Sequence, residues 1–375
     1  MNYFSKEQER TRKAVREVVT KEILPHIQDW EEAEEFPKSL YSIFGELGFL
    51  GLGYPESVGG SGGDIFDMVL MTEELMRAGS GGLTAGLCSL SIALPPIVKK
   101  GSPEQIEEFV KPVFDGKRIA ALGITEPGCG SDVASLTTTA ERRGDHYIVN
   151  GSKTFITSGV RADQLTTAVR TGGPGAKGIS FLVIETDTPG YSVGKKLKKM
   201  GWWASDTAEI YFDNCRVPAA NLIGEENKGF YTIMENFQTE RLFLSVMANE
   251  TARLALEEAL AYTKERSAFG RTLKEFQVTR HKLVDMATLV EVSREYTYAV
   301  AARMNGGENQ LKEISMAKNF ACDAADKVTH AAVQLLGGYG YMRESRVERL
   351  YRDSRILSIG GGTTEIMKEI ISGLL

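Results

Sequence analysis

The spacing of apolar side chains changes twice along the chain and thereby divides it into three parts. Up to about residue 117, apolar residues recur at steps of three and four, as in Val15, Val19 and Ile23. This spacing is typical of one face of an α-helix. Pro25 follows the stripe, so we expect the first helix to end or bend there. The pattern predicts an N-terminal α-helical domain over residues 1–117.

Short apolar runs separated by turn residues replace the helical spacing in the middle of the chain. Such runs predict β-strands. The dipeptide Asn150-Gly151 between two of these runs predicts a hairpin turn. We therefore expect a middle β domain over residues 118–225, with strands at residues 145–151, 153–157, 178–185 and 208–212.

The helical spacing returns after Gly224 and continues to the end of the chain. Glycines at Gly306-Gly307 and Gly337-Gly338 punctuate it, as expected between helices. The order of helices, strands and helices indicates an α+β fold. The third part is a C-terminal α-helical domain over residues 226–375, with long helices at residues 229–264, 275–304, 311–336 and 347–354.

One long uncharged run, residues 78–98, contains several glycines and serines and two prolines. This composition favours a buried helix of a globular protein over a membrane span. The first residues of the chain, MNYFSKEQERTRKAV, resemble neither a secretory signal nor a transit peptide. We therefore expect no membrane span.

The composition is that of a soluble globular protein, with 42% apolar and 25% charged residues. A formal net charge of −6 argues against nucleic acid or an anionic membrane as the main partner. The four cysteines and four histidines form no cluster with metal-ligand spacing, so no metal site is expected. Dispersed cysteines indicate reduced thiols, which predicts a cytoplasmic protein.

The segment LGITEPGCGSD, residues 122–132, leaves an apolar run and enters a turn rich in glycine and proline. Pro127 fixes its own φ, and Gly128 and Gly130 can adopt positive φ. Such a turn exposes backbone N–H groups, and Thr125 and Ser131 add hydroxyl groups. The residues suit a flat, partly anionic ligand, but an ordinary surface turn explains them equally well.

A carboxylate interrupts the apolar stripe of the predicted helix at residues 229–264. Ile233, Phe237 and Leu244 recur at steps of four and seven, and Glu240 occupies the position between them. Burial there would raise the pKa of Glu240 toward the range useful for a general base. The alternative is a Glu paired with a basic residue of a neighbouring helix. Arg241 is a poor partner because adjacent helical side chains do not face each other.

The segment at residues 122–132 resembles the first signature of the acyl-CoA dehydrogenase family, and the resemblance extends over essentially the whole chain. It implies a β domain, antiparallel, between an N-terminal helical domain and a C-terminal four-helix bundle. It further implies FAD, formation of the α,β-double bond of an acyl-CoA, an electron-transfer flavoprotein as electron acceptor, and a homotetramer. The other matching segments are residues 153–157, 238–241, 266–270, 334–340 and 352–366.

The resemblance also bears on the catalytic base. Most members carry a Glu two residues before a Thr in the C-terminal signature, where this chain has Gly361 before Thr363. The isovaleryl-CoA and long-chain types carry the base on the earlier helix, directly before an Arg, and Glu240 fits that pattern. Gly361 is then expected to contribute only its backbone N–H, to the thioester carbonyl. Glu365 is a weaker competitor, placed by the resemblance near the polar part of the flavin.

The resemblance assigns the remaining binding residues position by position. The flavin is expected to contact the first loop and the strand after it, through Leu122, Ile124, Thr125, Gly130, Ser131, Phe155, Ile156 and Thr157. Residues reaching the FAD of a neighbouring subunit are Arg266, Phe269 and Gln277, and those at its diphosphate or adenosine are Gln334, Leu335, Gly337 and Gly338, with Thr363 and Glu365 completing the site. Candidates for the acyl-pantetheine channel are Ser131, Tyr231, Gln238, Arg241 and Gly362.

Gly360 and Gly361 place no side chain over the first carbons of the thioester. We therefore predict that branched, cyclic or bulky acyl groups are accepted. One alternative is an acyl-CoA oxidase-type flavoenzyme that reduces O2, although such relatives are usually longer. Another is a non-catalytic acyl-CoA-binding flavoprotein. Glu240 disfavours this alternative, because burying a carboxylate that has no functional role costs free energy.

Overall fold

The N-terminal part of the computed structural model, which describes residues 3–375, is helical, as the apolar spacing predicts. Helix α1 is followed by a π-helical turn at Val19–Ile23, and the chain breaks at Pro25 before α2 begins. The helices are α1 (Lys6–Val18), α2 (Ile27–Ala33), α3 (Ser39–Glu46), α4 (Ile65–Met76), α5 (Gly81–Leu87), α6 (Leu90–Ala93), α7 (Pro95–Lys100), α8 (Pro103–Phe109) and α9 (Lys111–Phe114).

The uncharged run at residues 78–98 is not the single buried helix that we expected. It forms three short helices, α5, α6 and α7, and it is mostly buried. The break before α7 follows from Pro95, which lacks the N–H that a continuous helix requires. No single helix among residues 3–375 is long and apolar enough to cross a membrane. One pair of helices, Gly81–Leu87 with Leu90–Lys100, has the length and composition of a membrane span, but the two helices are bent by 49° relative to each other.

The middle part folds as one eight-stranded sheet in the order β6-β7-β3-β2-β4-β5-β8, with β1 beside β4. Most pairs are antiparallel, but β1 and β2 each pair with β4 in parallel, so the sheet is mixed rather than wholly antiparallel. The strands are β1 (Ala120–Gly123), β2 (Thr139–Arg143), β3 (His146–Thr157), β4 (Gln164–Arg170), β5 (Ile179–Glu185), β6 (Tyr191–Lys196), β7 (Thr207–Pro218) and β8 (Leu222–Ile223).

The hairpin turn predicted at Asn150-Gly151 is wrong. Strand β3 runs through this dipeptide, and the hairpin between β2 and β3 turns at Gly144, which has φ 64°. Gly151 instead lies at an irregularity in the pairing of β3 with β7. A Cβ on Gly151 would lie 2.6 Å from Oγ1 of Thr138. The glycine therefore allows two chain segments to approach closely, which is the other common role of glycine within a strand.

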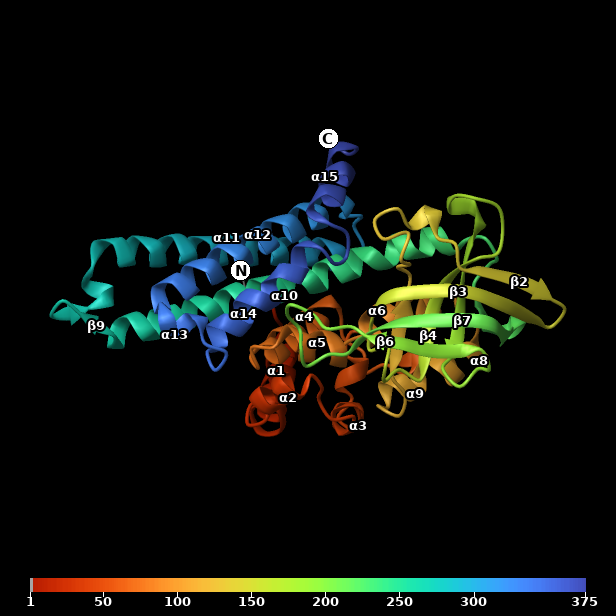
Figure 1. Ribbon diagram of the computed structural model, residues 1–375, viewed down its shortest axis with the longest axis horizontal. Helices are drawn as coiled ribbons and strands as arrows, with labels where there is room; N and C mark the ends of the chain where they lie inside the picture. The colour runs from red at the N-terminus through yellow and green to blue at the C-terminus, as the bar shows by residue number, and fades with distance from the viewer. Residues whose placement is uncertain (1–2) are drawn as a thin grey trace.

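The C-terminal part is a bundle in which α10 is 37 residues long and α10, α11 and α12 run side by side (Figure 1). Its tip at β9 and the β domain lie at opposite ends of the long axis of the molecule (Figure 1). The predicted helix at residues 311–336 is confirmed to the residue. The elements are α10 (Gly229–Glu265), β9 (Ser267–Ala268), β10 (Arg271–Thr272), α11 (Gln277–Asn305), α12 (Leu311–Leu336), α13 (Gly338–Tyr341), α14 (Arg346–Ser354) and α15 (Thr364–Ser372).

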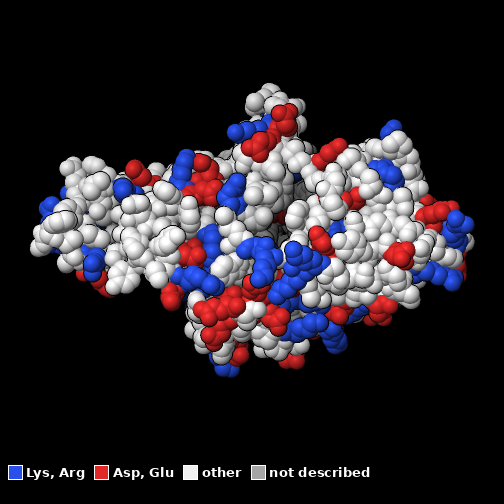
Figure 2. Space-filling model, in the orientation of Figure 1, with Lys and Arg blue, Asp and Glu red and all other residues white. Residues whose placement is uncertain are grey.

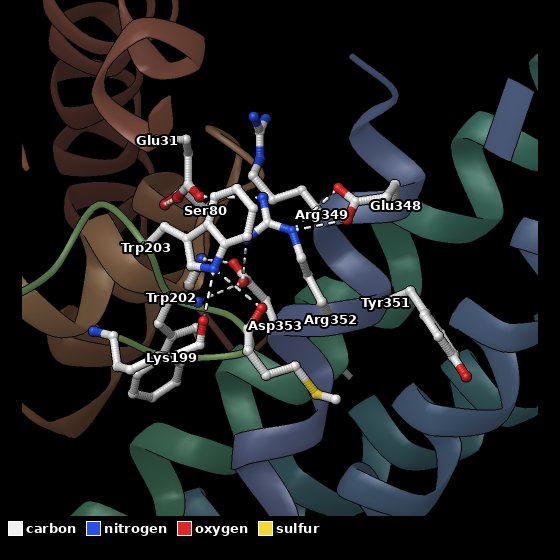
Figure 3. A network of polar contacts seen from close by, with 12 residues as sticks. Glu31, Ser80, Lys199, Trp202, Trp203, Glu348, Arg349, Tyr351, Arg352 and Asp353 are labelled. Carbon is white, nitrogen blue, oxygen red and sulfur yellow. Dashed lines mark hydrogen bonds and ion pairs between the residues drawn. The ribbon is translucent and has the colours of Figure 1, made fainter. Parts of the chain in front are cut away.

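Helix α14 ties the three parts together. The carboxylate of Asp353 accepts the N–H of Trp202 at 2.6 Å (Figure 3). It also accepts the N–H of Gly81 at 3.0 Å. The guanidinium of Arg352 lies 3.6 Å from the centre of the Trp203 ring, a cation–π contact (Figure 3). Lys and Arg side chains gather at the centre of this face, where the domains meet (Figure 2). These contacts fix the β domain and α5 against the bundle.

Candidate active site

Helix α10 carries Glu240 on a face that is otherwise apolar. Ile233, Leu244 and Ala248 on this face are buried, and Phe237 is half-buried. Glu240 keeps some exposed surface, but its Oε2 atom is buried and has no hydrogen-bond partner among the described residues. A carboxylate oxygen left in this condition is costly unless a ligand uses it.

The surroundings of Glu240 determine its protonation. Burial raises the pKa of Glu240 to about 7, and the positive charges of Arg241 and Lys318 partly offset this rise. A carboxyl group with a pKa near neutrality is ionised in a large fraction of molecules and still binds a proton firmly. That combination is what a general base needs.

The turn at residues 360–362 packs directly against Glu240. A Cβ on Gly361 would lie 3.6 Å from Oε1 of Glu240 and 2.5 Å from Cδ1 of Leu244. Gly361 also has φ 63°, a conformation that side chains disfavour. A side chain at residue 361 would thus collide with Leu244, and the carboxylate beside this turn is that of Glu240 on α10.

Two buried cations hold this turn by its carbonyl groups. Nε of Arg241 donates to the carbonyl of Gly361 at 3.4 Å, and Nζ of Lys318 donates to the carbonyl of Gly362 at 2.7 Å. The N–H of Gly361 donates to no backbone carbonyl within residues 3–375. It therefore remains available to a ligand. The sequence reasoning missed Lys318, although its place beside Ala317 and Ala321 on the apolar face of α12 could have shown that it is buried.

The loop at residues 122–132 is built around a buried ion pair. Glu126 and Cys129 exchange backbone hydrogen bonds and so form a tight turn. The carboxylate of Glu126 accepts from Nζ of Lys153 at 2.8 Å. Burial alone would raise the pKa of Glu126, but Lys153 and the hydrogen bonds of Thr138 hold it at about 2. The pair anchors the loop to β3.

Thr125 and Phe155 are brought close to each other by that anchor. The N–H of Thr154 donates to the carbonyl of Thr125 at 2.9 Å, which joins the loop to the strand. Phe155 has φ 60° and a side chain that is 68% exposed. The space beside Gly128 is open, and so is nearly all of that beside Gly130. An exposed ring and an open backbone loop thus lie next to each other.

The remaining predicted flavin contacts of this region differ in how they can act. Ile124 and Ile156 point into the hydrophobic core, so only their backbone atoms are open to a ligand. Leu122 and Thr157 are partly exposed, and Ser131 is exposed. Their side chains are therefore accessible.

The residues predicted to serve a neighbouring subunit are remote from this loop in one chain. Arg266 and Phe269 lie at the tip formed by β9 and β10, at the end of the molecule opposite the β domain (Figure 1). Phe269 is 96% exposed, and Gln277 is exposed as well. The end of α12 and the start of α13 present the exposed residues Gln334, Gly337 and Gly338, with Leu335 partly exposed.

The second candidate carboxylate, Glu365, has a different environment. It is exposed at the start of α15, where Thr363 caps the helix by accepting the N–H of Ile366 at 3.3 Å. Hydrogen bonds from its own N–H and from Thr363 lower the pKa of Glu365. A carboxylate stabilised in this way is a poorer base than Glu240. Of the channel candidates, Tyr231 is exposed, Gln238 and Gly362 are partly buried, and Arg241 is buried.

Three family models match nearly the whole chain. They are the acyl-CoA dehydrogenase N-terminal domain over residues 5–117, the middle domain over residues 121–215 and the C-terminal domain over residues 227–374. The chain belongs to the acyl-CoA dehydrogenase family. The family and the fold class expected from the sequence are thus confirmed, and so is an oxidoreductase with FAD as its cofactor.

Individual relatives agree over their full lengths. An acyl-CoA dehydrogenase of Bacillus subtilis is 41% identical over 100% of this chain and 99% of its own. The caffeyl-CoA reductase-Etf complex subunit CarC of Acetobacterium woodii is 39% identical over 100% of this chain and 99% of its own. The crystal structure of a probable acyl-CoA dehydrogenase from Mycobacterium abscessus is 52% identical, covers 99% of both chains and has a TM-score of 0.98.

The residues of this acyl-CoA dehydrogenase fit FAD. A flat ring system needs an apolar surface and backbone donors at its rim, and the exposed Phe155 beside the open loop at residues 122–132 supplies both. A diphosphate needs close backbone approach, and added Cβ atoms on Gly337 and Gly338 would meet nothing within 4 Å.

Proposed function

We propose that Glu240 is the base with which this acyl-CoA dehydrogenase removes the α-proton of an acyl-CoA thioester. The observation that carries the proposal is the buried, unpartnered Oε2 of Glu240 beside the Gly361 turn. In this step the α C–H bond breaks and an O–H bond forms on Glu240. The electron pair of the broken α C–H bond forms the α,β-double bond. The β-hydrogen leaves with its own electron pair as a hydride, for which bound FAD supplies the acceptor.

The turn at residues 360–362 has a second task in this reaction. Removal of the α-proton places negative charge on the thioester carbonyl oxygen, which must be stabilised. The N–H of Gly361 has no backbone acceptor in the part of the chain that the structure describes, and we assign it to this oxygen. Arg241 and Lys318, which hold the neighbouring carbonyls, keep that N–H in place and add positive charge nearby.

The experiment for the base compares Glu240→Gln with Glu365→Gln. Both substitutions remove one carboxylate from the segments implicated by the sequence, but only Glu240 lies on the apolar face of α10. Glu240→Gln should retain FAD and lose turnover by about a hundredfold to ten-thousandfold, the range for a general base. Glu365→Gln should retain turnover within a few-fold. Full turnover in Glu240→Gln would end the assignment.

The substrate is proposed to carry a branched, cyclic or bulky acyl group. A Cβ on Gly360 would meet only the carbonyl of Ile356, at 3.6 Å, so the space over the turn is open. Farther along α10, a cavity of about 40 Å³ is lined by Phe243 and by apolar residues of the N-terminal domain, among them Phe49, Leu52, Met68 and Met71. We propose that the acyl chain enters this cavity, whose small volume would restrict long linear chains, whereas branches beside Gly360 would have room. Turnover across linear, isovaleryl and cyclohexyl thioesters tests this.

An electron-transfer flavoprotein is the proposed electron acceptor. CarC, at 39% identity over the whole chain, is named as a subunit of a complex with Etf, and this supports the proposal. Reduction of O2 is the alternative, as in an oxidase-type enzyme. Oxygen uptake after reduction by acyl-CoA separates the two, because a dehydrogenase consumes little oxygen without its acceptor.

The functional unit is proposed to be a homotetramer. Phe269 lies between β9 and β10 at the tip of the bundle, at the end of the molecule opposite the β domain that carries the loop at residues 122–132 (Figure 1). A second copy can bring the two together. This assembly would complete the FAD site with Arg266, Phe269 and Gln277 of a partner subunit.

A further inference from the structure

Lys318 is buried in an unusual way. It lies on α12 with no exposed surface, and its Nζ donates one hydrogen bond, of 2.7 Å, to the carbonyl of Gly362. It forms no ion pair with an Asp or Glu among residues 3–375. Lys153, the other lysine with no exposed surface, pairs with Glu126 at 2.8 Å. A buried ammonium group whose only described partner is a neutral carbonyl is costly.

The groups around Lys318 show what its charge can act on. Glu240 and Arg241 face it from α10, Glu365 from α15, and Cys322 from the next turn of α12. Burial lowers the pKa of Lys318, whereas the negative charge of Glu240 favours its protonated form. Glu365 is exposed and therefore well screened by solvent. Of these two carboxylates, Glu240 is the less screened, because its Oε2 is buried and it lies beside the turn of Gly361 and Gly362 that Lys318 holds.

We propose that Lys318 is a positioning residue for the reaction of Glu240. It fixes the turn at residues 361–362 through the Gly362 carbonyl, and its positive charge keeps Glu240 ionised and ready to accept a proton. This inference rests on the proposed function, because it presupposes that Glu240 is the base. It adds a residue of α12 that acts on the site through the carbonyl of Gly362.

The two parts of this role have different consequences. Loss of the hydrogen bond to Gly362 loosens the turn and lowers the rate at every pH. Loss of the charge changes the pH at which Glu240 ionises, because a positive neighbour stabilises the carboxylate and lowers its pKa. Only the second effect moves a pH profile, so it separates the proposed role from a purely structural one.

The test measures kcat/KM of the FAD-loaded enzyme from pH 5 to 9 for the natural protein and for Lys318→Met. Met keeps the length and apolar stem of Lys but carries no charge. The midpoint of the acidic limb should move to higher pH by about one unit, a tenfold change in proton affinity. The control is Lys327→Met on the same helix, where Lys327 is exposed and pairs only with Asp323. The profile of this control should coincide with that of the natural protein.

A profile of Lys318→Met that is lowered but not displaced would overturn the proposal. If Lys318→Met does not fold, Lys318→Gln, which keeps a polar group, undergoes the same measurement with the same two outcomes. Glu240→Gln separates the two levels of the argument. An inactive Glu240→Gln with an undisplaced Lys318→Met profile rejects only the role of Lys318, whereas an active Glu240→Gln rejects the base itself.

Discussion

Glu240 on α10 and Gly361 in the turn before α15 are neighbours in space, since a Cβ on Gly361 would lie 3.6 Å from Oε1 of Glu240. Residues 240 and 361 are the two positions at which the family resemblance expects the catalytic carboxylate. In this chain one carries it and the other has no side chain. The carboxylate of Glu240 therefore lies beside the second of these positions, although the two residues are far apart in the sequence.

Glycine at residue 361 should be required for the geometry of the site. Gly361→Ala places a Cβ 2.5 Å from Cδ1 of Leu244 on a backbone with φ 63°. We expect it to lower the thermal unfolding temperature and the turnover, at a cost of roughly 1–3 kcal/mol from the strained backbone and the crowding. Gly173→Ala, where a Cβ meets no atom within 4 Å, is the matched control and should change neither quantity. An unaffected Gly361→Ala would contradict the packing described here.

The activity should depend on pH through Glu240. Its pKa of about 7 means that the base is protonated, and thus inactive, at lower pH. We expect kcat/KM to rise with pH and to reach half of its plateau near pH 7 in the natural enzyme. Steady-state rates from pH 5 to 9 measure this directly. A midpoint close to pH 4.5, the ordinary value for a Glu, would show that burial does not act on the base in the enzyme.

Glu240 should reduce the stability of the protein at neutral and higher pH. Its pKa is higher in the folded state than the ordinary value of 4.5, so the folded state binds more protons between pH 4.5 and 7. The free energy of unfolding therefore falls as pH rises through this window. Glu240→Gln should be more stable than the natural protein at pH 8, by on the order of 3 kcal/mol, and equal to it near pH 4. Thermal unfolding of both proteins at both pH values tests this prediction. A stability difference that is the same at the two pH values would contradict the link between the pKa of Glu240 and stability.

The buried pair of Glu126 and Lys153 should be needed to hold the loop at residues 122–132. Lys153→Met leaves the carboxylate of Glu126 buried without its cation, which typically costs about 3–5 kcal/mol. We expect lower stability and loss of bound FAD, read from the flavin absorbance of the purified protein. Lys117→Met removes an exposed lysine that pairs with Asp115 and should have no effect. Full FAD content in Lys153→Met would show that the ion pair is not needed to hold the loop in the conformation that binds FAD.

Phe269 should matter for the cofactor although its side chain is almost fully exposed in one chain. Its side chain is 96% exposed, so Phe269→Ala should leave the secondary structure intact. If a partner subunit uses this ring to hold FAD, the variant should lose FAD on dilution, and gel filtration should show a weaker assembly. Leu47→Ala, another exposed apolar residue at 51%, is the control. Unchanged FAD retention in Phe269→Ala would count against the shared site.

Local signals in the sequence predicted the helices well because their ends are marked chemically. Helix α12 begins and ends where predicted, since glycines stand on both sides of it. The same signals failed at Asn150-Gly151. A glycine that is typical of a turn can also lie within a strand where the strand pairing is irregular, and here it allows Thr138 to pack closely against the strand. They also failed at residues 78–98, where the uncharged composition predicted one helix and Pro95 instead begins a separate helix.

The site was only partly predictable for a related reason. The position of Glu240 on the apolar face of α10 could be predicted because helical spacing is a local property of the sequence. The contact of Glu240 with the Gly361 turn, and the bond of Lys318 to the Gly362 carbonyl, join segments that are far apart in the sequence. No periodicity reports such contacts. They depend on how α10, α12 and the turn before α15 pack together.

Anaerobic mixing of the FAD-loaded Glu240→Gln variant with an acyl-CoA that the natural enzyme oxidises tests the central claim most directly. The absorbance of oxidised flavin, followed in a single turnover, reports the chemical step without any contribution from the electron acceptor. We predict that the variant binds the acyl-CoA and that its flavin is bleached about a hundredfold to ten-thousandfold more slowly than in the natural enzyme. Bleaching at the natural rate would show that another group removes the α-proton.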